Sequence, residues 1–308
     1  MRQPVYRRDM KRRLVSLAVF ATAVIAQDDK QAPAPSLAAL RESAEALRPL
    51  MQKKTPPRAG DWLAEHEEQG QAFDEYMKSR PNRPTAKRTT LYIQPIGDFT
   101  KAQQQLVKDT AELMGIVFGV PVKTLDALAD AAIPDSARRT HPTWGGKQFL
   151  STYILDEVLL PRRPADAVAV LGLTATDLFP EPSWNFVFGQ ASLRGRVGVW
   201  SLARYGDPEK ERATVLRRTL QVATHETGHM FGIQHCTMHE CGMNGSNSLP
   251  ESDRAPLAFC SECELKLWWA CGLDPLPRYE KLAEFAKTNG LADAEAEWRR
   301  RIKALEKK

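Results

Sequence analysis

After a short apolar stretch at residues 14–26, apolar positions are sparse up to about residue 88 of this chain of 308 residues and frequent beyond it. Residues 27–40 are rich in Ala, Pro and Gln, which is typical of a linker. In residues 41–80 apolar side chains are sparse among charged ones, which predicts helices that pack loosely on the rest. After a turn-rich boundary at residues 80–88, the apolar density rises, and we expect the main domain to begin at residue 89.

Two periodicities predict the elements of the main domain. Runs rich in β-branched and aromatic residues predict strands, and apolar side chains repeating every three or four residues predict helices. We expect strands over residues 89–99, 118–125 and 167–173, a hairpin of 185–192 and 196–203 turned at 193–195, and helices over 100–117, 147–160, 209–231 and from 260 to the end. This order predicts an α+β fold, or an α/β-type one, with a helical C-terminal part.

The first 26 residues have the pattern of an export signal. A basic stretch, residues 1–13, precedes an apolar stretch, residues 14–26, which ends in small residues suited to cleavage before Gln27. The thirteen residues of this apolar stretch make about 20 Å of helix, less than the roughly 30 Å of a bilayer core. We expect an exported protein, periplasmic or secreted, with no stable membrane anchor after cleavage. An uncleaved anchor and a start at Met10 are the alternatives.

The net charge of +5 follows from that signal. Six of the 43 basic residues and one of the 38 acidic residues lie in residues 1–26, so the rest of the chain carries equal numbers of each. A neutral remainder does not favour a nucleic-acid partner. We expect a monomer that acts on a peptide or protein.

Four of the six histidines lie in one stretch of nineteen residues, HETGHMFGIQHCTMHECGM, residues 225–243. Within it HETGH has the form H-E-x-x-H, and on a helix His225 and His229 project from the same face. Two imidazoles so placed can bind one zinc ion. The carboxylate of Glu226, next to the first histidine, can reach a metal-bound water and act as a general base.

The stretch continues as H-E-x-x-H-x-x-G-x-x-H, with Gly232 and His235. On an uninterrupted helix the third histidine would lie about 15 Å along the axis from the first. A glycine can adopt a left-handed conformation, end the helix and turn the chain back. We therefore expect Gly232 to bring His235 to the same ion, which leaves a fourth position for water, as in catalytic zinc sites.

The cysteines predict a second zinc site. Cys236 and Cys241 form one pair, and Cys260 and Cys263 form a C-x-x-C pair about twenty residues later. This spacing suits a closed, structural site of four thiolates. Two disulfides, and replacement of one thiolate by His239, remain alternatives. We expect two zinc ions per chain, one catalytic and one structural.

These motifs together resemble those of a known family. HETGHMFGIQHC, followed by Cys241-Gly242-Met243 and then CSEC, resembles the archaemetzincins, as does the segment over residues 170–192. The resemblance covers roughly residues 89–272. It implies a metzincin-like fold, in which a twisted mixed sheet lies over an active-site helix. It also implies that Met243 is the methionine of the Met-turn beneath the zinc.

We therefore predict a zinc-dependent metallopeptidase with Glu226 as general base. A non-catalytic zinc-stabilised binding module and a zinc hydrolase of non-peptide amides or esters are the competing hypotheses. The predicted organisation is a signal peptide, a linker and charged helical extension, an archaemetzincin-like peptidase domain and a helical C-terminal extension, over residues 1–26, 27–88, 89–272 and 273–308.

Overall fold

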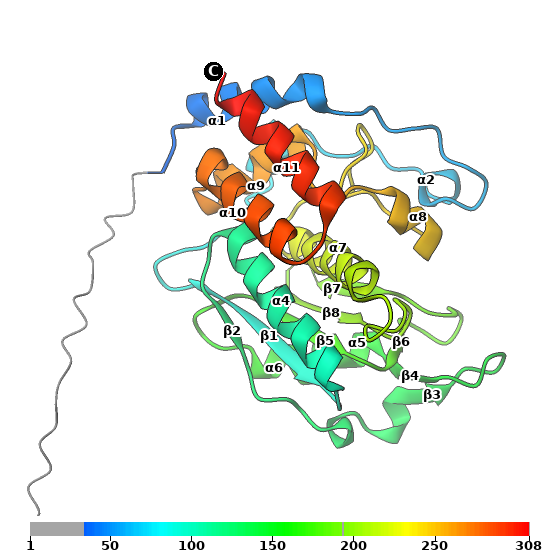
Figure 1. Cartoon of the computed structure of the whole chain (residues 1–308). Coiled ribbons are helices and arrows are strands. Elements are labelled where there is room, and N and C mark those ends of the chain that lie inside the picture. The colour runs from blue at the N-terminus through cyan, green and yellow to red at the C-terminus, as the bar shows by residue number, and fades with distance from the viewer. Residues whose placement is uncertain (1–33, 193, 308) are drawn as a thin grey trace, which may run out of the picture. The chain divides into compact units, whose positions relative to one another are not determined.

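A five-stranded sheet in the order β2-β1-β5-β8-β7 forms the main layer of the fold (Figure 1). Neighbouring strands are parallel except β7, the edge strand, which runs antiparallel to β8. The strands are β1 (Thr90–Ile96), β2 (Val122–Thr124), β5 (Ala167–Thr174), β7 (Gly189–Ser192) and β8 (Val197–Ser201). The predicted strands and the hairpin are therefore confirmed, with shorter bounds than expected for all of them except β5.

The computed structural model describes residues 34–192 and 194–307. The predicted signal at residues 1–26 lies outside this range, as does Leu193 in the predicted turn of the hairpin. Residues from Ala34 onwards form one compact unit. Among the described residues, no helix is long and apolar enough to cross a membrane.

Helices cover both faces of the sheet. On one face lie α4 (Lys101–Phe118) and α7 (Arg212–Met230), both close to their predicted bounds. The other face is covered by a continuous helical segment made of α5 (Ser151–Tyr153), the π-helical η4 (Ile154–Leu159) and α6 (Leu160–Arg162). Along β1, Leu91 and Ile93 belong to the core on the α4 and α7 side of the sheet, whereas Tyr92 and Ile96 belong to the core on the η4 side. Side chains of a strand alternate between its two faces in this way.

A second, smaller sheet corrects one prediction. Residues 147–160 were expected to be helical throughout, but Lys147–Leu150 form strand β4, which lies between β3 (Arg138–Thr140) and β6 (Asp177–Phe179). The side-chain amide of Gln148 donates to Asp177 Oδ2 at 2.7 Å, and Phe149 is buried. Pairing with residues distant in sequence overrides the local helical pattern here.

Helices from both ends of the described chain pack together, with α8 in contact with α7 and α10 in contact with α4. The N-terminal ones are α1 (Leu37–Leu47), α2 (Trp62–Glu65) and α3 (Phe73–Lys78), and the C-terminal ones are α8 (Leu249–Arg254), α9 (Ser261–Cys271), α10 (Pro275–Thr288) and α11 (Ala292–Leu305). Short 3-10 turns complete the elements at η1 (Arg48–Leu50), η2 (Asp130–Ala132) and η3 (Asp135–Ala137). Helix α9 contacts α1 and α3, and α10 contacts α4 and α11 (Figure 1).

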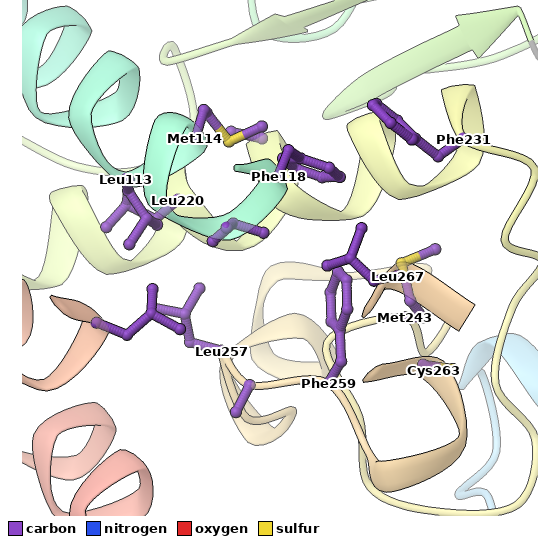
Figure 2. Close-up of a cluster of buried hydrophobic side chains, with 14 of the residues drawn as sticks. Leu113, Met114, Phe118, Leu220, Phe231, Met243, Leu257, Phe259, Cys263 and Leu267 are labelled. Atoms are coloured by element: carbon purple, nitrogen blue, oxygen red, sulfur yellow. The ribbon is translucent and has the colours of Figure 1, made fainter. Parts of the chain in front are cut away.

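One continuous core joins this helical layer to the sheet. Figure 2 shows Phe118 of α4 opposite Phe259 and Leu267, near and on α9. Leu113 of α4 and Phe231, just after α7, belong to the same core. The ring centroids of Phe118 and Phe231 are 4.9 Å apart. The end of α7 is thus held between the sheet and α9, which fixes the place where the histidine motif leaves the helix.

Candidate metal centres and active site

Helix α7 and the turn after it bring the three motif histidines together. His225 Nε2 and His229 Nε2 are 3.0 Å apart, as expected for positions i and i+4 on one helix face. The ring centroid of His235 lies 5.2 Å from that of His225 and 4.9 Å from that of His229. Their candidate ligand atoms all lie within 4.8 Å of one another.

The turn depends on glycine, as predicted. Helix α7 ends at Met230, and Gly232 has a φ of 83°. This is the left-handed region, which side chains with a Cβ rarely occupy. A Cβ at this position would also lie 2.9 Å from Pro81 Cβ, so both backbone conformation and space require glycine.

The second ring nitrogen of each histidine has an oxygen partner. His225 Nδ1 donates to Gly242 O at 3.0 Å, and His229 Nδ1 donates to Ile233 O at 2.8 Å. A carbonyl oxygen can only accept, so the proton of each neutral ring is on Nδ1 and the Nε2 lone pair is free. His235 Nδ1 lies 2.9 Å and 3.0 Å from the two carboxylate oxygens of Glu68.

This arrangement fits a zinc ion. Burial lowers the pKa of His225 well below its usual range and lowers that of His229 to about 4, so both rings are neutral near pH 7. Two nitrogens bound to one zinc at 2.0–2.1 Å lie roughly 3.3 Å apart in tetrahedral geometry. Two lone pairs 3.0 Å apart repel unless a cation lies between them, so the donor set favours a metal.

Glu226 lies beside these nitrogens and is buried, with 9% of its surface exposed. Burial raises the pKa of its carboxyl to about 8. A nearby cation favours the carboxylate form and opposes this shift. Edge strand β7 passes close by, since a Cβ at Gly189 would lie 3.0 Å from Glu226 Cγ.

A cavity of about 540 Å³ opens onto the histidines and Glu226. Aromatic and amide side chains line part of it, and Gly189 and Gln190 of β7 form part of one wall. Among the lining residues are Trp62, Trp184, Phe186, Phe188, Gln190 and Asn244. A larger cavity of about 830 Å³ lies elsewhere, between residues 50–63 and the segment after α10, and none of the motif histidines lines it.

Met243 packs against helix α7 at Gly228, a residue between His225 and His229 in sequence. A Cβ at Gly228 would lie 2.5 Å from Met243 Sδ, so the thioether is in direct contact with the helix there. Cys236 N donates to Met243 O at 2.8 Å, which links this methionine to the turn that carries His235.

The four predicted cysteines also converge. Their sulfur atoms all lie within 4.8 Å of one another, and the side chains are buried. Cys236 Sγ and Cys260 Sγ are 3.7 Å apart, close to the roughly 3.8 Å between two thiolates on one tetrahedral zinc. Backbone N–H groups of Met243 and Cys260 donate to Cys241 Sγ, an arrangement that stabilises thiolate. The cluster can bind zinc.

The structure also bears on the two alternatives for this cluster. All five cysteines are in the described range, and all are free thiols. His239 lies next to the cluster but is not one of the four converging groups. The nearby side chain of Cys260 raises the pKa of His239.

Two residues near the third histidine were not found from the sequence. Glu68 and Trp62 precede His235 by more than 160 residues and lie in a segment expected to be a loosely packed extension. A lone carboxylate and a lone tryptophan have no spacing signal that connects them to His235. Only the folded chain brings them there.

Comparison with known proteins agrees with the site. The model for peptidase family M54 matches residues 165–268. Archaemetzincin-2 of Rattus norvegicus is 33% identical over an alignment of 278 residues, which covers 78% of this chain and 77% of that protein. The chain belongs to the archaemetzincin family. By this membership it is a zinc metallopeptidase, a hydrolase, as the motifs predicted.

Archaeal members of the archaemetzincin family match a smaller part of the chain. The archaemetzincin of Pyrococcus furiosus is 32% identical over 185 residues, covering 58% of this chain and 93% of that protein. The crystal structure of archaemetzincin from Methanopyrus kandleri aligns with a TM-score of 0.50 at 34% identity, covering 61% of this chain and 97% of that one. This likeness confirms the mixed α+β fold.

Proposed function

We propose that the cleft hydrolyses peptide bonds with Glu226 as general base and one zinc ion held by His225, His229 and His235. One observation carries the proposal. The ring nitrogens of three histidines and the buried carboxyl group of Glu226 converge in the cavity of about 540 Å³. A site kept for stability alone would have no need of that carboxylate at an open cavity.

The chemistry that zinc supplies when bound is Lewis acidity, which polarises a carbonyl and makes a water molecule more acidic. Glu226 accepts a proton from the water that attacks the scissile carbonyl carbon, so that an O–H bond breaks as the new C–O bond forms. The same carboxyl then donates this proton to the amide nitrogen as the C–N bond breaks.

We propose that β7 binds the substrate backbone. This strand pairs with β8 on one side and forms the edge of the sheet next to Glu226. An extended peptide can add to such an edge as a further strand, with main-chain hydrogen bonds that depend little on sequence. Gly189 and Gln190 of β7 line the cleft, which supports this placement.

We propose a second, structural zinc at Cys236, Cys241, Cys260 and Cys263, giving two ions per chain. The buried, mutually close thiols support it. The apolar side chain of Met243 then forms the floor beneath the histidine site, in a metzincin-like arrangement. We also propose that the protein is exported, is a monomer, and acts on a peptide or protein and not on nucleic acid. These three points rest on the sequence.

The test is digestion of a mixed peptide library by zinc-loaded protein without residues 1–26, beside Glu226→Gln. We expect the wild type to cleave, with cut positions showing whether it trims ends or cuts internally. Loss of the general base should lower kcat/KM by about 10²–10⁴-fold while zinc content stays the same. Equal cleavage by both proteins would refute the role of Glu226, and a well-folded wild type with both zinc ions but no cleavage would refute the peptidase reading.

A further inference from the structure

Residues 51–72, here called the strap, run along the loop that carries His235 and the first two cysteines. At one end Glu240 N donates to Gln52 O at 2.9 Å, and Lys54 Nζ pairs with Glu240 Oε2 at 2.9 Å. At the other end Gln71 Nε2 donates to Gly232 O at 3.3 Å. The strap is thus attached on both sides of the third histidine.

The middle of the strap reaches the cleft. Trp62 N donates to Glu251 Oε1 at 2.9 Å, which places α2 beside α8 (Figure 1). The indole of Trp62 packs on Gly245, where a Cβ would lie 2.5 Å from the ring. Its ring meets that of His235 edge-on with centroids 5.1 Å apart, and it lines the cavity. The strap therefore forms a wall of the site and does not fill it.

Glu68 makes the strap's contact with a candidate zinc ligand. Both of its carboxylate oxygens lie within 3.0 Å of His235 Nδ1. The corresponding nitrogens of His225 and His229 meet backbone carbonyls instead. Their rings are also held by helix α7, whereas His235 lies in a loop beyond the Gly232 turn. The histidine with the least local support is the one with a carboxylate partner.

We propose that Glu68 is the positioning residue for His235. It fixes the ring so that Nε2 faces the other two histidines, and its negative charge makes that nitrogen a stronger donor. Trp62 restricts rotation of the same ring from the side. The inference rests on the proposed function in taking His235 as a zinc ligand. It makes the strap a permanent part of the active site.

The test compares zinc affinity at the histidine site in the full chain and in Glu68→Ala, Glu68→Gln and Glu67→Gln. Affinity is measured by competition with a chromophoric chelator. Cobalt(II) substitution separates the sites, because thiolate charge-transfer bands in the near ultraviolet report the cysteines alone. A change in the visible d–d bands without a change in these bands therefore reports the histidines. Glu67 is the matched control, since it is the neighbouring carboxylate on the strap and is exposed.

We expect Glu68→Ala to weaken zinc at the histidine site by about 10- to 100-fold and to change the d–d bands, with the thiolate bands unchanged. Glu68→Gln retains an acceptor without the charge, so its affinity should lie between those of Glu68→Ala and wild type. Glu67→Gln should match wild type.

Two results would overturn the inference. One is zinc affinity of both Glu68 variants within twofold of wild type. The other is a loss at both metal sites with a lower Tm of the metal-free Glu68→Gln protein, which would make Glu68 a structural anchor. Absence of zinc from the histidines of the wild type would refute the proposed function instead, so the two failures are distinguishable.

Discussion

The ring of His229 is fixed in orientation and protonation by its surroundings in the cleft. Its Nδ1 donates to Ile233 O at 2.8 Å, two residues before His235, so the ring connects helix α7 with the turn that follows. Its Nε2 faces that of His225. Burial keeps its pKa near 4, so the ring stays neutral and able to bind a cation across the neutral pH range.

Replacement of His229 by Ala should reduce zinc from two ions per chain to one. The cysteine cluster shares no ligand with the histidine site, so the remaining ion should be the one with thiolate bands. Several kcal/mol of Lewis-acid stabilisation would be lost, and kcat/KM should fall by roughly 10³-fold. Elemental analysis and peptide cleavage measure both. Two zinc ions in the variant would exclude His229 as a ligand.

At the scale of elements, the end of α7 decides the geometry of the site. The helix supplies two histidines and Glu226, and the chain must then reverse within a few residues to return His235. Gly232 makes this possible through its φ of 83° and its contact with Pro81. The packing of Phe231 on Phe118 holds the reversal in place from the other side.

Gly232→Ala should therefore lower the free energy of unfolding by more than the cost of a positive φ alone. A positive φ at a residue with a Cβ costs about 1–2 kcal/mol, and the overlap with Pro81 adds to it. Gly290→Ala is the matched control, because Gly290 has a φ of 70° just after α10 and nothing within 4 Å of a Cβ. We expect Gly232→Ala to lose more unfolding free energy than the control and also to bind zinc more weakly at the histidines. Equal losses would show that the contact with Pro81 has no effect.

At the scale of the whole molecule, the cysteine cluster joins parts of the chain that are distant in sequence. It connects the loop after His235 to the start of α9, and the strap and α1 contact the same region. A buried network continues beyond it. Glu264 of α9 pairs with Arg278 of α10 at 3.0 Å, and with Arg301 of α11 at 3.5 Å.

Cys260→Ser should lower the Tm by about 10 °C or more in reducing and in oxidising buffer alike, because the binding energy of a structural zinc is part of the folding energy. Cys271→Ser is the control, since Cys271 is not in the cluster and its loss should leave zinc content unchanged. Thermal unfolding with and without reductant measures the effect. A drop confined to oxidising buffer would favour disulfides.

The sequence by itself determined the features that depend on short spacing. The two helical histidines, the turn at Gly232, the cysteine pairs, and the strands and helices with clear periodicity all follow from residues a few positions apart. The mixed fold and the family followed from the same stretches. The predicted export signal and the division into four segments stay predictions that depend on sequence.

The tertiary structure decided what depends on contacts between distant segments. Residues 147–150 are a strand because β6 pairs with them, although their local pattern allows a helix. Glu68 and Trp62 lie at the site because the strap crosses the loop after α7, and a lone carboxylate among many has no periodic or spacing signal. Local chemistry is encoded by neighbours in the chain, whereas the supporting contacts of a metal ligand are set by packing in three dimensions.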